Sequence, residues 1–450
     1  MRILQINTQD QPGGAAEIAR TLHHGYRLQG HESWMVVGRK HGEDGNILSI
    51  PNQERRSAYV RWMVRLAERL WKANDRFPGS WRLGGALSWM AEPYRKWSVS
   101  VGREDFDFPA SREIPDLIPE LPDVLHCHNL HGGYFDLRVL PCLSHRIPTI
   151  VTLHDAWLLS GHCAHSLDCE RWKNGCGACP YPSLYPAIEK DASDWNWRRK
   201  LNLYRQSRLY VTTPCNWLME RVQSSILAHA MVDARVIPNG VDLSIFAPGD
   251  RETARKRLGI PEGAWVLLFA ADGIRNNPWK DFETMRAAVK WIGEAVQSKE
   301  VWFVALGESS PDETIGRSVI HFVPHQSDAK TVAAYYQAAD VYLHAAAADT
   351  FPTTVLEALA CGTPVVATEV GGIAEQVDEA ETGFLVQPHD AEMMGRCVLR
   401  ILEDKGLAEG MRHRCREQAV KRFSREMMVD RYLQWCTDIL AREARSGADQ

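Results

Sequence analysis

The chain has 450 residues, of which 24% are charged and 45% apolar. These are ordinary values for a globular protein, and they exclude a disordered, collagen-like or coiled-coil chain; at roughly 150 residues per domain, the length predicts two or three domains. The formal net charge is -5, so the chain lacks the positive excess typical of nucleic-acid-binding proteins, and we expect no nucleic-acid partner.

Targeting and redox signals predict a cytoplasmic protein. No stretch reaches the ~18 consecutive apolar residues of a membrane-spanning helix, and the start, MRILQIN, lacks the features of a signal peptide. The 11 cysteines are an odd number without a secretion signal. They are therefore interpreted as reduced thiols or metal ligands rather than as a disulfide framework.

Short apolar runs alternate with amphipathic segments of helix length, such as 281–296 and 331–339. This alternation is typical of parallel sheets covered by helices. It predicts an α/β fold with two doubly wound domains. The expected strands form two sets, namely 2–7, 34–38, 123–129, 149–155, 209–214 and 235–239, followed by 265–272, 301–307, 320–324, 341–345, 364–368 and 383–386.

Proline, asparagine and glycine interrupt the apolar run 237–249, and such residues mark loops. We place the interdomain linker there. The predicted organisation is an N-terminal domain over residues 1–240, a C-terminal domain over 241–423 and a final segment over 424–450. This last segment has helical periodicity, and we expect it to cross back to the first domain.

Residues 55–97 interrupt the alternation and are interpreted as an insertion. They carry ten basic residues, three acidic residues and five tryptophans, at positions 62, 71, 81, 89 and 97. Tryptophan and clustered basic residues favour the interface of an anionic membrane. The alternative is a helical hairpin whose tryptophans pack inward and whose arginines are solvated.

Gly13 and Gly14 lie where the first predicted strand turns into a helix. Backbone N–H groups at a helix start can bind a phosphate, and the helix dipole favours an anion there. Glycine is also the usual residue of a tight turn, so the pair alone does not separate the two interpretations.

Histidines end two neighbouring predicted strands. His128 closes the segment 123–129, and His154 follows the run that starts at residue 149. Open α/β sheets bind ligands at the carboxyl ends of their strands, so both imidazoles are candidate site residues. Either of them could instead satisfy nearby backbone groups.

In the second domain, Arg275 and Lys280 follow an apolar strand and precede a helix. A planar guanidinium and a compact ammonium can converge on one diphosphate; the alternative is a solvated loop with two cations. Further on, Asp349 precedes a loop, and Glu357 lies on a helix that ends near Gly362. Glu357 suits the vicinal hydroxyls of a ribose, and Asp349 suits a sugar near the reacting bond.

With these motifs, the chain resembles the retaining GT-B enzymes of glycosyltransferase family 4. The resemblance rests on the glycine pair, the His-x-His strand end, Ile237-Pro-Asn-Gly-Val-Asp242, the Arg-x4-Lys pair, the acid-x7-Glu block and the final helix. It implies two Rossmann-like domains facing across a cleft. It also implies sugar transfer from a nucleotide-diphosphate sugar to a glycan or a lipid-linked glycan, in cell-surface polysaccharide assembly, with no metal needed for transfer.

The resemblance also implies a role for each matched residue. Arg275 and Lys280 would hold the donor diphosphate, Glu357 the ribose and Asp349 the transferred sugar. Gly13 and Gly14 would approach the phosphate. His128 would lie by the reacting sugar, with His154 on the acceptor side. Asp349 stands where the family usually has glutamate, and Pro352 stands where it usually has glycine, so the choice of donor is not set.

Four cysteines form a separate cluster, with the spacing C-x5-C-x6-C-x2-C at Cys163, Cys169, Cys176 and Cys179. Four thiolates so close together suit a tetrahedral structural zinc, and free thiols are the alternative.

Two other functions remain open from the sequence. One is a nucleotide-sugar 2-epimerase, which shares the two-domain architecture but needs no acceptor. The other is a non-catalytic partner of a glycan-assembly complex. For the transferase, a membrane contact through residues 55–97 would place the protein at the inner face of the membrane.

Overall fold

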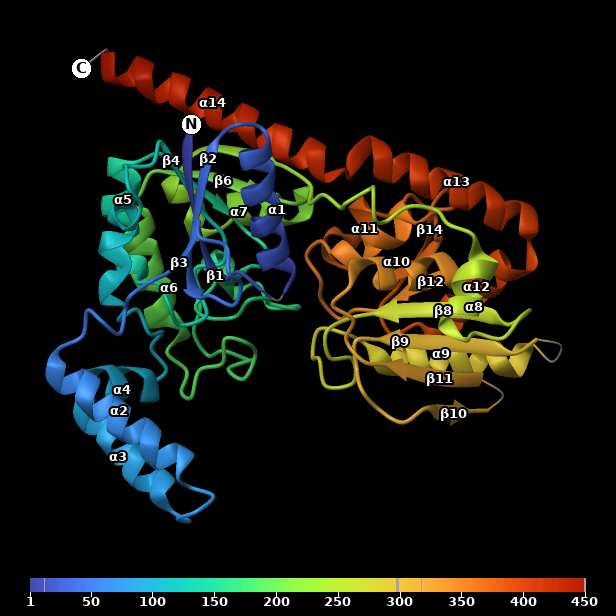
Figure 1. Cartoon of the computed structure of the whole chain (residues 1–450), viewed down its shortest axis with the longest axis horizontal. Coiled ribbons are helices and arrows are strands. Elements are labelled where there is room, and N and C mark those ends of the chain that lie inside the picture. Colours follow the sequence, from blue (N-terminus) through green and yellow to red (C-terminus); the bar gives the residue numbers. More distant parts are fainter. Residues whose placement is uncertain (12, 297–298, 317, 449–450) are drawn as a thin grey trace. The chain divides into compact units, whose positions relative to one another are not determined.

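The computed structural model describes residues 1–11, 13–296, 299–316 and 318–448 (Figure 1). The chain forms two compact units. Unit 1 consists of Met1–Thr213, Met219–Arg235 and Leu433–Gln450, and unit 2 consists of Pro214–Leu218 and Val236–Tyr432. Each unit contains a seven-stranded sheet of its own.

The sheet of unit 1 has the order β3-β2-β1-β4-β5-β6-β7, and β1 pairs in parallel with both β2 and β4. Every residue of β4, β5 and β6 is buried, as expected for parallel strands covered on both faces. The strands are β1 (Arg2–Gln9), β2 (Glu32–Arg39), β3 (Ile47–Ser49), β4 (Val124–Cys127), β5 (Thr149–Thr152), β6 (Leu209–Thr213) and β7 (Met231–Val236). The main helices around this sheet are α1 (Gly14–Leu28), α5 (Leu140–Arg146), α6 (Ser193–Tyr204) and α7 (Asn216–Gln223), the first residues of α7 being counted with unit 2.

The sheet of unit 2 has the order β10-β11-β9-β8-β12-β13-β14. The pair β10–β11 is antiparallel, while β8 pairs in parallel with β9 and β12. Its strands are β8 (Trp265–Ala270), β9 (Val301–Leu306), β10 (Glu313–Ile315), β11 (Ser318–Val323), β12 (Val341–His344), β13 (Val365–Thr368) and β14 (Gly383–Val386). Its helices are α8 (Arg251–Leu258), α9 (Phe282–Ala295), α10 (Ala329–Ala338), α11 (Thr353–Ala360), α12 (Ala391–Glu403) and α13 (Lys405–Arg422).

Two seven-stranded α/β sheets confirm the predicted fold class. Three strands differ from the prediction. The strand expected at 235–239 lies instead at Met231–Val236, because Pro238 has no N–H to donate and cannot continue a ladder. The short edge strands β3 and β10 were not predicted, since three residues are too few for a periodic signal.

The last helix is α14 (Arg425–Ala448). Its residues up to Tyr432 belong to unit 2, and those from Leu433 onward belong to unit 1. In unit 1, Tyr210 donates a hydrogen bond to Glu443 at 2.5 Å, and Arg235 pairs with Asp438 at 2.8 Å.

The insertion folds into three helices, α2 (Ala58–Lys72), α3 (Ser80–Ala91) and α4 (Pro93–Ser100). Helices α2 and α3 pack together as a hairpin that extends away from the sheet of unit 1 (Figure 1). Small residues allow the close approach: a Cβ at Gly84 would lie 2.7 Å from Trp71 Nε1.

All five tryptophans of the insertion are substantially exposed, with exposed fractions from 43% to 62%. The alternative that they pack inward is therefore wrong. Within the described residues, no helix combines the length and apolar character needed to cross a membrane.

Candidate functional site

The predicted site residues of unit 2 gather where the order of its sheet reverses. The first strand, β8, lies between β9 and β12. The segment after β8 carries Arg275 and Lys280, and the segment after β12 carries Asp349. The carboxyl ends of strands at such a switch point are the usual ligand site of an open α/β sheet.

Lys280 and Asp349 form an ion pair at 2.5 Å, and both side chains are largely buried. Nε2 of the fully buried His344 lies 3.2 Å from the same carboxylate oxygen. Burial raises the pKa of Asp349, but the Lys280 ammonium and the His344 imidazole outweigh it and hold this pKa well below its ordinary value. Asp349 is therefore an anion at neutral pH, and it can accept hydrogen bonds from sugar hydroxyls.

Arg275 pairs with a different carboxylate, that of Glu308 after β9. Its Nε lies 2.6 Å from Glu308 Oε1, and its backbone N–H donates to Oε2 at 2.9 Å. The guanidinium also stacks over Phe322 at 4.8 Å. Both cations of the predicted diphosphate site thus have carboxylate partners that an anionic ligand would have to replace.

Glu357 lies on α11 and accepts a hydrogen bond from the Tyr336 hydroxyl at 2.8 Å. The Tyr336 ring packs on Tyr342 at 5.5 Å, and the Tyr342 hydroxyl lies 3.2 Å from His344 Nδ1. A continuous set of side chains therefore links Glu357 to Asp349. The structure orients both predicted acids of unit 2 through this set.

In unit 1, Gly13 precedes the first turn of α1. Its φ of 114° is a conformation that favours glycine. A Cβ at Gly14 would have no neighbour within 4 Å. The start of this 15-residue helix is thus open on the side of Gly14, as a bound phosphate would require.

His128 and His154 lie side by side at the ends of β4 and β5. Their rings stack, and His128 Nδ1 is 3.1 Å from His154 Nε2. His128 Nε2 lies 2.9 Å from the amide oxygen of Gln5 on β1. Burial lowers the pKa of His154 to about 4 and that of His128 well below its ordinary value. Both imidazoles are therefore neutral hydrogen-bonding groups at pH 7.

A pocket of about 670 Å³ lies at the same edge of this sheet, and we call it the strand-edge pocket. Its walls include His131, Trp157 and Tyr185. His131 Nε2 pairs with Asp155 at 2.6 Å, and the Tyr185 hydroxyl lies 3.3 Å from His131 Nδ1. Aromatic rings beside fixed polar groups suit a sugar ligand.

The four clustered cysteines all line one small cavity of about 20 Å³. Burial raises the pKa of the Cys176 thiol to about 12, and it also raises the pKa of Cys163 and of Cys179. All 11 cysteines of the chain are free thiols. Among the described residues, no group of three or more His, Cys, Asp or Glu side chains is arranged to hold a metal ion, so the geometry does not support the predicted zinc.

Sequence reasoning missed several residues of these sites. His344 ends β12 just as His128 follows β4, so its position in the strand was an available signal. Glu308 follows β9 and Asp155 follows β5, so the same signal was available for both. Their partners could not be predicted, because these lie 33 and 24 residues away in the chain.

Two family models match the chain. One, described as Glycosyltransferase Family 4, matches residues 12–245, and the other, described as Glycosyl transferases group 1, matches residues 250–422. The putative colanic acid biosynthesis glycosyl transferase WcaC of Escherichia coli K12 is 25% identical over 393 residues, which are 84% of this chain and 86% of that relative.

A D-inositol 3-phosphate glycosyltransferase of Actinosynnema mirum is 36% identical over 191 residues. The match spans 39% of this chain and 45% of that relative, so less than half the length of that relative is matched. The solved structure of Anabaena Alr3699/HepE in complex with UDP and glucose has a TM-score of 0.62 at 16% identity, covering 97% of this chain and 99% of that one. This similarity concerns the fold. By its match to the two family models, the chain belongs to glycosyltransferase family 4.

Proposed function

We propose that this protein is a retaining, metal-independent glycosyltransferase of the hexosyltransferase type. It would move a sugar from a nucleotide-diphosphate donor to an acceptor hydroxyl. The observation that carries the proposal is the group formed by Lys280, Asp349 and His344, which lies at the switch point of unit 2, within the residues matched by the group 1 model.

On the donor side, Arg275 and Lys280 would bind the diphosphate. A diphosphate would replace Glu308 and Asp349 as the partner of these cations, and it would leave Asp349 free to accept hydrogen bonds from the transferred sugar. Glu357, already oriented by Tyr336, would accept the ribose hydroxyls. The HepE structure with UDP and glucose makes a UDP-sugar the first donor to test.

On the acceptor side, the amides at Gly13 and Gly14 would add positive potential at the leaving phosphate. Preorganised donors of this kind stabilise the charge that develops in a transition state. His128 and His154, neutral at pH 7, would orient the sugar and the acceptor by hydrogen bonds. We assign no side chain as nucleophile, because the leaving phosphate can take the acceptor proton on the retained face.

Incubation with a UDP-sugar tests this function. A transferase should turn the donor over slowly alone and faster once an acceptor is added. Rapid turnover without acceptor would indicate the epimerase, and binding without transfer across an acceptor panel would indicate a non-catalytic partner. Thermal shift with a set of nucleoside diphosphates identifies the base, since a ligand of the folded state raises the melting temperature.

We further propose that the acceptor is a lipid-linked glycan used in cell-surface polysaccharide assembly, met at the inner face of the membrane. The name of the Escherichia coli relative points to polysaccharide assembly. The membrane contact would be one face of α2, where Trp62, Arg65, Arg69 and Lys72 are exposed. Their spacing of three and four residues puts these side chains on one side of the helix.

Sedimentation with phosphatidylglycerol vesicles tests the membrane contact. Replacing Arg65, Arg69 and Lys72 by glutamine should lower vesicle binding about a hundredfold, since each cation near an anionic surface contributes about 1 kcal/mol. Phosphatidylcholine vesicles should bind weakly.

The matched control carries Arg198→Gln, Lys290→Gln and Arg396→Gln, which remove three exposed cations outside the hairpin. It should bind vesicles like the wild type. Equal binding by the α2 variant and the wild type would show that the hairpin is not the contact.

The structural zinc at Cys163, Cys169, Cys176 and Cys179 remains a proposal that rests on the sequence spacing. Metal analysis of protein purified without chelators should find about one equivalent of zinc, lost in Cys176→Ser. Binding at such a site would be local folding energy, so zinc removal should loosen the loop 161–180. A zinc content near zero would show that the four cysteines are free thiols.

A further inference from the structure

A second pocket of unit 1, with a volume of about 500 Å³, lies where the hairpin joins the rest of the unit, and we call it the hairpin-base pocket. Its walls come from the start of α2, from α4, from the segment 104–109 and from α6. Five arginines line it, namely Arg55, Arg56, Arg95, Arg138 and Arg199.

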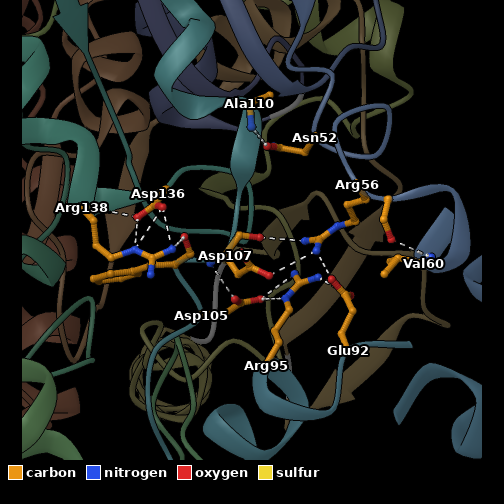
Figure 2. A network of polar contacts seen from close by, with 12 residues as sticks. Asn52, Arg56, Val60, Glu92, Arg95, Asp105, Asp107, Ala110, Asp136 and Arg138 are labelled. Atoms are coloured by element: carbon orange, nitrogen blue, oxygen red, sulfur yellow. Dashed lines mark hydrogen bonds and ion pairs between the residues drawn. The ribbon is translucent and has the colours of Figure 1, made fainter. Parts of the chain in front are cut away.

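Four of these arginines have carboxylate partners. Arg56 contacts Glu92 and Asp107, and Arg95 pairs with Asp105 at 2.6 Å. Figure 2 shows this network, with Arg138 and Asp136 on the other side of Asp105 and Asp107. Arg55 pairs with Glu113 at 2.6 Å. These pairs fix the walls of the pocket and neutralise their charge.

Arg199 differs from the other four. Among the described residues, no carboxylate lies within ion-pair distance of it, and its Nη1 donates only to the backbone oxygen of Glu104 at 3.2 Å. The guanidinium lies 3.9 Å from the Phe106 ring centre and 5.0 Å from that of Trp195. Burial and the neighbouring Arg138 lower the pKa of Arg199 to about 10, which leaves it charged at pH 7.

Arg103 stacks on the same Trp195 ring, at 4.4 Å. It too has no carboxylate partner within the described part of the chain, and it lines the strand-edge pocket. Two guanidinium groups thus contact one indole ring, and among the described residues neither has a carboxylate within ion-pair distance. An anion that contacted both guanidinium groups would supply the ion-pair partner that each of them lacks.

The two pockets adjoin, because Val99, Glu104, Asp105 and Phe106 line both. At this junction the Glu104 side chain is 8% exposed, and Lys200 and Trp157 donate to its Oε1 at 3.0 and 2.6 Å. Its other oxygen, Oε2, has no hydrogen-bond partner. A buried acceptor without a donor is rare, and a ligand hydroxyl would supply one.

We propose that Arg103 and Arg199 form an anion site at this junction that binds the phosphate ester of a lipid-carried acceptor. The inference rests on the proposed function, in which the sugar of that acceptor occupies the strand-edge pocket and its lipid lies along the hairpin. A guanidinium matches phosphate oxygens with two parallel N–H groups, and two such groups surround the anion.

Titration calorimetry of the full chain with octyl phosphate tests the site. Arg199→Gln and Arg103→Gln should each weaken binding about tenfold or more, because each removes a hydrogen bond to a charged group. Arg199→Lys, which keeps the charge, should recover much of the affinity. Arg198→Gln is the matched control, since the exposed Arg198 pairs with Asp194 on the same helix, and it should bind like the wild type.

Inorganic phosphate separates the two sources of the anion. It should bind more weakly than octyl phosphate, because it lacks the alkyl chain that would contact the apolar walls. Equal affinity for the two probes would overturn the lipid-carried acceptor. Unchanged octyl phosphate binding in both Arg199→Gln and Arg103→Gln would overturn the site itself.

The variant Arg275→Gln distinguishes this inference from the proposed donor site. Octyl phosphate binding that survives in Arg275→Gln and is lost in Arg199→Gln supports the junction site, whatever UDP titrations show for the donor. Binding that is lost in Arg275→Gln and kept in Arg199→Gln overturns the junction site and leaves the proposed function intact.

Discussion

Alanine in place of Arg275 or Lys280 should slow sugar transfer by about two to three orders of magnitude, on the scale known for removing one preorganised donor from an active site. Both cations follow β8 at the switch point of unit 2. In the proposed reaction, negative charge builds on the departing diphosphate, and each cation would stabilise that charge more in the transition state than in the bound donor. Steady-state transfer rates with saturating acceptor measure the loss.

The two variants differ in their expected stability. The Arg275 side chain is 43% exposed, so its removal should leave the melting temperature nearly unchanged. Removing Lys280 leaves the buried Asp349 carboxylate without its ammonium partner, which is destabilising. The matched control is Lys290→Ala, because Lys290 is an exposed lysine of α9 in the same unit. Transfer rates near those of the wild type in Arg275→Ala would show that Arg275 does not stabilise the donor diphosphate.

The sheets could be predicted from the sequence because their central strands are buried on both faces. Such strands appear as continuous apolar runs, as in 265–270 or 301–306. The edge strands β3 and β10 have only three residues each and are partly exposed, so their composition carries no comparable signal. Strand β7 ends before the predicted range does, because Pro238 cannot donate a hydrogen bond to the neighbouring strand. The apolar residues around Pro238 made the segment look like one continuous strand.

For the candidate site, the positions of its residues at strand ends could be predicted from the sequence, but their ion-pair partners could not. Asp349 was identified from its spacing to Glu357, yet its low pKa depends on Lys280, which is 69 residues earlier in the chain. The pairing of Arg275 with Glu308 likewise follows only from the adjacency of β8 and β9. Strand order is a property of the tertiary fold, so these ion pairs cannot be predicted from a single sequence.

The hairpin shows the same limit. A helical hairpin was one of the two interpretations of residues 55–97, and α2 and α3 form one, but large side chains occur all around α2. The side that packs on α3 was decided by small residues such as Ala67 and Gly84, which permit close contact. Because these small residues form the contact between α2 and α3, the tryptophans remain exposed. The sequence alone did not decide which side of the helix would be buried.

Unit 1 should lose stability as the pH falls from about 6.5 toward 4, because it buries neutral histidines. Burial lowers the pKa of His23 to about 4 and that of His126 to about 3, and both side chains are fully buried. Below the ordinary value near 6.5, the unfolded chain binds protons that the folded chain does not, so protonation favours unfolding. At pH 5 each histidine should cost about 2 kcal/mol of the free energy of unfolding.

Urea unfolding with pulsed hydrogen exchange of β1 and β4 peptides measures this loss for unit 1. His126→Gln removes one of the titrating groups of unit 1, so its free energy of unfolding should change less between pH 7 and pH 5 than that of the wild type, even if the variant is less stable at every pH. The matched control is His229→Gln, at an exposed histidine of the same unit, and it should keep the wild-type slope. A wild-type free energy of unfolding that stays constant from pH 7 to pH 5 would show that these imidazoles bind protons in the folded state as readily as in the unfolded chain.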